Sequence, residues 1–287
     1  MQKKKNPTLT QFNVGINSIM IKELYDGAPI SACQVDLIEV SIADSGVMQK
    51  GEINQKRLEE FATLSNIYSV HGPFLYDCYE NQVNWGLKSN RNFEIMEQVF
   101  KVADYLGAKY IVLHGDQVQS DYREAFLNVI DNFKQLSKMA ADYSMILLLE
   151  NVHRQKDIDR VGVLPHEVSQ VIQAVNAENL KFCFDIGHGT LTANQYGFDI
   201  LEYVKTLAPY LCHMHIHDNQ GIPEVIDEQF GDKHLPLGQG KVEYQKIFQA
   251  IANLDVKNMV LELRPKNGRI AAEKSISILR ALQGSTK

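Results

Sequence analysis

Histidine and carboxylate side chains recur in this sequence where short apolar segments end. Nine of them share that placement or lie in the long loop after the seventh segment. The set is His71, His114, Glu150, Asp185, His188, His215, Asp232, His234 and Glu262. Gathering so many buried imidazoles and carboxylates carries a large free-energy penalty unless positive charge compensates it. The set therefore predicts a divalent metal centre, with a hydrogen-bonded polar rim as the alternative.

The types of these side chains narrow the choice of metal. Nitrogen and oxygen ligands without thiolates favour Zn²⁺ or Mn²⁺ over a soft metal. The four cysteines, at positions 33, 78, 183 and 212, form no C-x-x-C pair. Isolated cysteines in apolar runs are typical of buried thiols in a reducing compartment.

Eight apolar segments, read as strands, must position these residues. They span 12–16, 35–41, 67–72, 109–115, 145–151, 181–187, 211–218 and 258–263. Several are almost continuously apolar, which is typical of parallel strands covered by helices. Helical spacing follows at 126–139, 168–175 and 244–251, Gly107 is placed to end a helix, and Pro165 to begin one.

A strand–helix unit repeated eight times in 287 residues predicts a (β/α)₈ barrel, formed by one domain over 1–287. A doubly wound sheet is the alternative, although no G-x-G-x-x-G follows the first strand. In a (β/α)₈ barrel the chemistry sits at the carboxyl ends of the strands, so the nine residues should meet at one mouth.

The seventh segment tests that geometry. His213, His215 and His217 alternate with Met214 and Ile216, so the three imidazoles should face the barrel interior. We expect His215 to be the ligand because it lies near the strand end. His213 is interpreted as a deeper packing or supporting residue, and His217 as a partner of substrate or of Asp218.

Composition bears on partners and location. The 29 Lys and Arg against 35 Asp and Glu give a net charge of −6. This disfavours nucleic acid as a partner, although a local basic groove stays open as an alternative. No apolar run has the length of a signal peptide or of a membrane helix, so we expect a cytoplasmic protein without membrane association.

Seven motifs carry a resemblance. They are VHGPF at His71, LHG at His114, LLLEN at Glu150, FDIGHG at Asp185 and His188, HIHDN at His215, DKHLPLGQG at Asp232 and His234, and LELRP at Glu262. From the third strand to the eighth, the chain resembles the xylose-isomerase-like barrels. That superfamily includes the sugar isomerases and epimerases and the abasic-site nucleases of the endonuclease IV type.

The two branches imply different metal content. The isomerase resemblance implies one ion on Glu150, Asp185, His215 and Glu262, whereas the nuclease resemblance implies three ions on all nine residues. The chain departs from the nuclease motifs at Ile186, Gly187 and His217, where threonine, cysteine and asparagine are usual. These departures and the negative charge place a sugar or sugar-phosphate isomerase or epimerase slightly ahead.

Each hypothesis assigns roles. In the isomerase, Glu150 and Glu262 are the catalytic acid and base that move a proton through an enediolate. Substrate oxygens are bound by His188, Lys233 and Arg264. In the alternative, the nine residues hold a multinuclear zinc centre that hydrolyses a phosphoester, in abasic DNA or in a small molecule. A metal-storing or sugar-binding barrel is a third, non-enzymatic reading. The sugar and the oligomeric state stay open.

Overall fold

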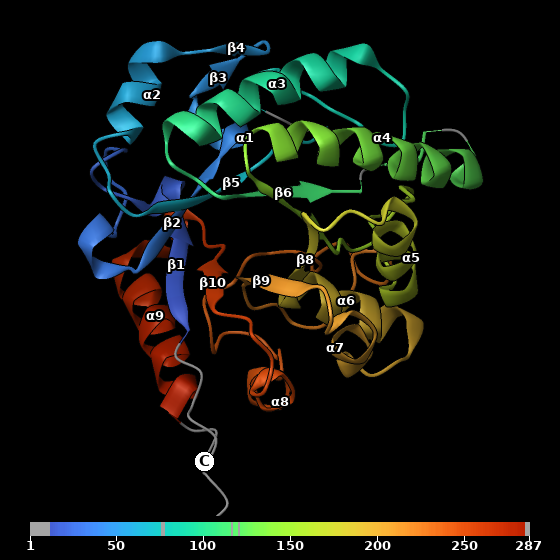
Figure 1. Ribbon diagram of the computed structural model, residues 1–287. Coiled ribbons are helices and arrows are strands. Elements are labelled where there is room, and N and C mark those ends of the chain that lie inside the picture. The colour runs from blue at the N-terminus through green and yellow to red at the C-terminus, as the bar shows by residue number, and fades with distance from the viewer. Residues whose placement is uncertain (1–11, 76–77, 116, 120, 285–287) are drawn as a thin grey trace, which may run out of the picture.

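The structure is a computed structural model that describes residues 12–75, 78–115, 117–119 and 121–284. Its centre is a closed barrel of eight parallel strands in the order β1-β10-β9-β8-β7-β6-β5-β2 (Figure 1). The strands are β1 (Asn13–Asn17), β2 (Leu37–Ser41), β5 (Ile67–His71), β6 (Tyr110–His114), β7 (Ile146–Glu150), β8 (Leu180–Asp185), β9 (Leu211–Ile216) and β10 (Asn258–Leu261). Each lies within one of the eight segments expected from the sequence, give or take a residue at its ends. The predicted (β/α)₈ barrel is therefore confirmed.

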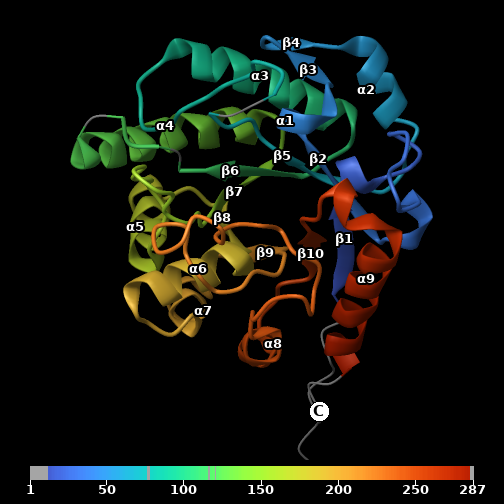
Figure 2. The same ribbon diagram turned by 180° about the vertical axis from the view of Figure 1, so that it is seen from behind.

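Helices surround the barrel, as the two opposite views show (Figures 1 and 2). They are α1 (Ile42–Ser45), α2 (Gln55–Phe61), α3 (Asn90–Tyr105), α4 (Tyr122–Asp142), α5 (Pro165–Val175), α6 (Ile186–Tyr196), α7 (Leu201–Leu207), α8 (Tyr244–Ile251) and α9 (Gly268–Gly284). The expected signals operate: Pro165 is the first residue of α5, and Gly107 follows α3 with a φ of 71°.

The connections are less regular than eight identical units. After β1 the described chain forms only the 3₁₀ turns η1 (Ser18–Met20) and η2 (Ala32–Gln34), because Gly27 and Pro29 interrupt this stretch. A small antiparallel pair, β3 (Met48–Gln49) and β4 (Glu52–Ile53), lies between α1 and α2. Two helices, α6 and α7, share the β8–β9 connection, and η3 (Pro265–Asn267) precedes α9.

The core has two parts. A large apolar cluster fills the layer between strands and helices. Val112, Leu148 and Cys183 form a separate, smaller apolar cluster. Glu39, Ser69 and His213 are also fully buried, and Cys183 is paired in register with His213. Apolar and polar side chains thus lie side by side in the interior of the barrel.

Candidate metal centre

The carboxyl ends of the strands surround a cavity of about 220 Å³. Seven of the nine expected residues line it: His71, His114, Glu150, His188, Asp232, His234 and Glu262. The other two, Asp185 and His215, are fully buried directly beneath. The structure therefore brings all nine residues to one site, as the strand-end argument requires.

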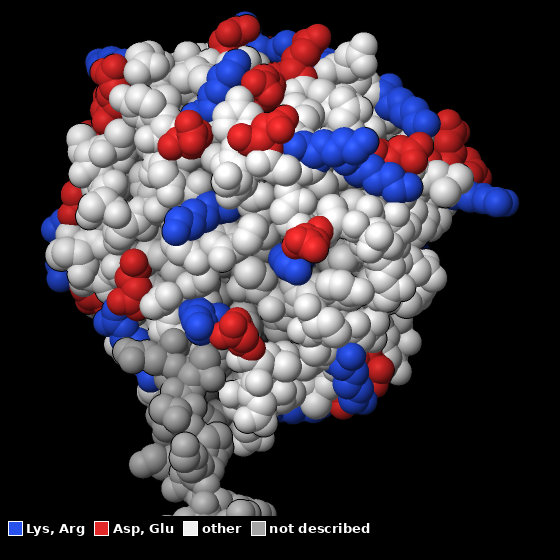
Figure 3. All heavy atoms as spheres, viewed as in Figure 1, with Lys and Arg blue, Asp and Glu red and all other residues white. Residues whose placement is uncertain are grey.

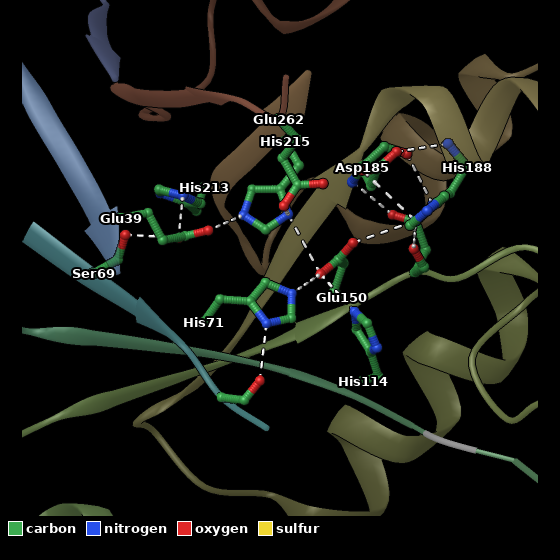
Figure 4. A network of polar contacts seen from close by, with 12 residues as sticks. Glu39, Ser69, His71, His114, Glu150, Asp185, His188, His213, His215 and Glu262 are labelled. Carbon is green, nitrogen blue, oxygen red and sulfur yellow. Dashed lines mark hydrogen bonds and ion pairs between the residues drawn. The ribbon is translucent and has the colours of Figure 1, made fainter. Parts of the chain in front are cut away.

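Glu150, the last residue of β7, is the hub of this site (Figure 4). Its Oε2 lies 3.3 Å from His71 Nε2, 3.2 Å from His114 Nε2 and 3.3 Å from His215 Nδ1. Its Oε1 lies 3.3 Å from His188 Nδ1. Four imidazoles from four elements thus converge on one carboxylate.

A second set shares Glu150. The donor atoms of Glu150, Asp185, His215 and Glu262 all lie within 4.8 Å of one another, and His215 Nδ1 is 3.5 Å from Glu262 Oε1. Asn151 locks the ends of β7 and β8 together, because its amide donates to Asp185 O and accepts from Asp185 N, each at 2.9 Å. We call His71, His114, Glu150, Asp185, His215 and Glu262 the Glu150 group.

A further set, which we call the Asp232 group, consists of His188, His217, Asp232 and His234. Asp232 Oδ2 lies 3.5 Å from His188 Nε2 and 2.9 Å from His234 Nε2. Asp232 Oδ1 lies 3.4 Å from His217 Nε2. The loop that carries Asp232 and His234 is the irregular stretch expected between 219 and 240, and His234 adopts a positive φ of 48° there.

Three of the histidines point one ring nitrogen away from these sets, toward an oxygen. The pairs are His71 Nδ1 with Gly72 O at 3.0 Å, His234 Nδ1 with Glu262 O at 2.8 Å, and His215 Nε2 with Glu39 Oε1 at 2.9 Å. An N–H that donates outward leaves the inner lone pair available, which is the arrangement that metal-binding histidines adopt.

The residues fit divalent cations. Glu150 Oε2, Asp185 Oδ2 and Asp232 Oδ1 are buried and have no hydrogen-bond partner within the described part of the chain. Ligands at about 2.0–2.3 Å around a tetrahedral ion lie roughly 3.3–3.8 Å apart, and most of the nitrogen–oxygen distances given above are close to this range. Oxygens left without partners at that spacing are donors arranged for metal ions.

In the metal-free chain, protons on histidines supply positive charge beside the buried carboxylates. Burial raises the pKa of Glu150, but the charges of His215 and His114 outweigh it and hold that pKa well below its ordinary value. Burial lowers the pKa of His71, but the hydrogen bond and charge of Glu150 raise it to about 9. At His114 burial prevails, and the pKa falls to about 4.

Three contributors to the site were not anticipated from strand ends. Glu39 lies in the middle of β2, and its carboxylate accepts from Ser69 Oγ at 2.7 Å and lies 3.5 Å from His213 Nε2. A lone glutamate in the apolar segment LIEVS was the available signal. His153 and Arg160, from the loop after β7, also line the cavity, and no strand-end rule points to them.

Two of the three residues expected to bind substrate lie at the cavity. His188 and Arg264 line the cavity, whereas Lys233 is exposed and is not among the lining residues. The expectation for His213 agrees with its deep position beside Glu39. His217 faces Asp185 and Asp232, while the carboxylate of Asp218 accepts four backbone N–H groups instead.

Within the described residues no helix is long and apolar enough to cross a membrane. The four cysteines are free thiols.

Several known proteins are similar to this chain. A probable endonuclease 4 of Mycoplasma pneumoniae is 22% identical over 249 residues, which is 84% of this chain and 79% of the relative. A D-tagatose 3-epimerase-like protein has a TM-score of 0.75 and 19% identity, covering 96% of this chain and 98% of its own. The IOLI protein, solved with a bound zinc atom, has a TM-score of 0.70 and 18% identity, covering 96% and 97%.

The solved structures at this identity show the same fold. The model of the family described as xylose isomerase-like TIM barrel matches residues 29–282, nearly the whole chain. The barrel, the placement of polar residues at its strand ends and this match agree. The chain belongs to the xylose isomerase-like TIM barrel family.

Proposed function

We propose that this protein is a multinuclear, metal-dependent hydrolase of phosphoesters. The main support for this proposal is the position of His71 and His114, whose Nε2 atoms face Glu150 Oε2 at 3.3 and 3.2 Å. A single ion on Glu150, Asp185, His215 and Glu262 would leave these two histidines without a metal ion to bind. A centre of several ions, held by the Glu150 group and the Asp232 group together, would use all of these residues.

Ions held by these residues would supply Lewis-acid chemistry and a water of lowered pKa for phosphoester hydrolysis. The chain's own residues supply the rest. Arg160 and Arg264 line the cavity, and guanidinium groups pair well with phosphate oxygens. Glu39 orients His215 through the 2.9 Å contact, and Asn151 fixes Asp185. These contacts hold the reacting groups in place before substrate arrives.

The size of the cavity favours a small phosphoester over duplex DNA as substrate. The site is a cavity of about 220 Å³. The loop after β7 pairs with the loop after β9 through Lys156 and Glu228, and both loops contribute to the cavity wall. On the face drawn in Figure 3, basic and acidic side chains are interspersed rather than gathered into a basic surface. With a net charge of −6, these features lack the positive footprint that duplex binding uses.

A sugar isomerase or epimerase with one ion is the second candidate. Glu262 favours it, because its carboxylate lines the cavity beside His215 and could exchange a proton with a bound sugar. The resemblance in fold to a D-tagatose 3-epimerase-like protein supports it, as the endonuclease 4 relative supports the hydrolase. The enclosure of Glu150 by four imidazoles weighs against that residue as a base.

Metal content and a substrate panel separate the two. We expect about three ions per chain in protein purified without chelator, with hydrolysis of small phosphoesters. No turnover of ketoses or ketose phosphates is expected, and little of an abasic oligonucleotide. His114→Ala should lower hydrolysis by more than about 100-fold, beyond what loss of an outer partner of a metal ligand costs. His166→Ala, an exposed histidine on α5, is the matched control and should be silent.

Two results would contradict the hydrolase. One ion per chain together with sugar turnover would establish the isomerase instead. Full activity in His114→Ala would exclude His114 from the metal centre that hydrolysis requires.

A further inference from the structure

His217 is buried in the site but lies outside the nine-residue set. Its side chain is fully buried, and neither ring nitrogen has a hydrogen-bond partner among the described residues. Its Nε2 lies 3.2 Å from Asp185 Oδ1 and 3.4 Å from Asp232 Oδ1. The nitrogen and the two carboxylate oxygens therefore surround a place where a positive charge is favoured, either a proton on Nε2 or a metal ion between these atoms.

We propose that His217 is a fourth protein ligand of the ion held by His188, Asp232 and His234. The inference rests on the metal centre of the proposed function and adds a residue to it. The donor atoms of the four side chains all lie within 4.8 Å of one another. The separations of 3.5 Å for His188 and 3.4 Å for His217 from Asp232 oxygens match neighbouring ligands of a tetrahedral ion, which lie roughly 3.3–3.8 Å apart.

Gly187 makes room for this imidazole. A Cβ atom at position 187 would lie 2.1 Å from His217 Cε1, 2.4 Å from Nε2 and 2.6 Å from Nδ1, so no larger residue fits beside the ring. On its other side the ring stacks on His234, with centroids 4.1 Å apart and planes 18° from parallel. Gly187 and His234 together hold the imidazole where its Nε2 faces Asp232.

The fourth ligand changes what this ion can do. Structural zinc sites have four protein ligands, whereas catalytic sites keep one position for water or substrate. His188, Asp232 and His234 line the cavity, while His217 reaches the group from the buried side and is not among the lining residues. The ion of the Asp232 group is accordingly closed and structural, and substrate contacts only the ions of the Glu150 group.

The test follows metal retention in His217→Asn, which keeps a polar side chain too short to reach the ion. Protein loaded with Zn²⁺ is exposed to a competing chelator, and the ions remaining per chain are counted over time. In the unchanged protein one ion should stay much longer than the others. In His217→Asn its release should speed up by at least about 100-fold, more than loss of an outer partner produces. His153→Asn is the matched control, because His153 is buried beside His188 at 4.9 Å between ring centroids but is outside the ligand set.

Cobalt reports the ligands of this ion through its visible spectrum. Replacing a nitrogen ligand by water keeps Co²⁺ four-coordinate but shifts its absorption bands. With Co²⁺ in the slowly exchanging site, His153→Asn should therefore give the spectrum of the unchanged protein, and His217→Asn a shifted one.

A second variant keeps the test decisive if His217→Asn does not fold. Gly187→Ala retains the imidazole but pushes it out of position, so it should also weaken retention of this ion. The double variant Gly187→Ala, His217→Asn should be no worse than His217→Asn alone, because the alanine then has no ring to displace.

The outcomes separate this inference from the proposed function. Three ions per chain with unchanged retention and spectrum in His217→Asn would overturn the fourth ligand and leave the hydrolase standing. No more than one ion in the unchanged protein would overturn both. Loss of the slow ion and a shifted cobalt spectrum in His217→Asn, but not in His153→Asn, would support the closed site.

Discussion

The Glu150 group and the Asp232 group hold similar side chains by different means. In the Glu150 group the residues lie at or directly after strand ends, where the backbone hydrogen bonds of the barrel fix them. In the Asp232 group, His188 lies in the first turn of α6 and His217 just beyond β9, while Asp232 and His234 lie in the long loop. Ligands at strand ends are held by the backbone hydrogen bonds of the sheet, whereas ligands on a loop need other contacts that fix the loop itself.

Asp218 supplies those contacts. Its Oδ1 accepts from the backbone N–H groups of Asn219 and Val242, and its Oδ2 accepts from those of Gly238 and Gly240. Its backbone also pairs with Leu235, next to His234, through two 2.8 Å hydrogen bonds. The carboxylate and the backbone of this one residue thus tie both ends of the segment after His234 to the end of β9.

The largest of the following effects is expected for Glu39→Gln, which acts on the Glu150 group. The amide keeps the shape of the side chain but loses the charge that orients His215 from below. We expect zinc affinity of the Glu150 group to fall about 10–100-fold, the usual cost of losing such a partner. Competition titration measures it, and retention of the ion in the Asp232 group should not change. Equal weakening of both groups would show that the two are not independently held.

A smaller effect, on the other group, is expected for Asp218→Asn. The amide oxygen can still accept, but the hydrogen bonds lose the assistance of charge and half of the lone pairs, so we expect a loss of about 1–3 kcal/mol in stability. Zinc retention in the Asp232 group should weaken, with little change in the Glu150 group. Urea denaturation and metal counting measure the two effects. Weakening confined to the Glu150 group would contradict the division described above.

The smallest effect is a pH dependence that both groups share. In the metal-free protein the pKa of His71 and that of His217 are raised to about 9, at His217 because the charges of Asp185 and Asp232 outweigh burial. Raised values stabilise the fold below the unfolded pKa of 6.5, and this stability is lost as the pH rises toward 9.

For two neighbouring histidines, His114 and His153, stability depends on pH in the opposite direction. Burial lowers the pKa of His114 to about 4 and that of His153 to about 3, so stability falls as the pH drops below 6.5. Metal-free protein should therefore be most stable near pH 6.5, as denaturation midpoints at pH 5, 6.5 and 9 would show. With zinc bound, ions replace the protons and the decline toward pH 9 should disappear. A chelated protein that gains stability up to pH 9 would refute this account.

Much of this molecule follows from the order of residues along the chain. Apolar segments such as 145–151 are buried on both faces, and that pattern predicts parallel strands. Since all strands run in one direction, their last residues must meet at one mouth, and the sequence alone therefore predicts that His71, His114, Glu150 and Glu262 lie together. The sequence also predicts that Gly107 follows the end of a helix and that Pro165 begins one, because each of these residues acts on the backbone within one or two positions.

Other features depend on contacts between distant parts of the chain. Glu39 meets His215 because β2 and β9 face each other across the barrel interior, and neither segment alone reveals the pair. Similarly, His217 gains its role from Gly187, thirty positions earlier, and from Asp232 in a loop without regular structure. Strand periodicity determines which side a residue faces, so the sequence by itself determined the barrel and the strand-end residues. Which atoms meet in the interior and which loop reaches the mouth were decided only by closure of the barrel.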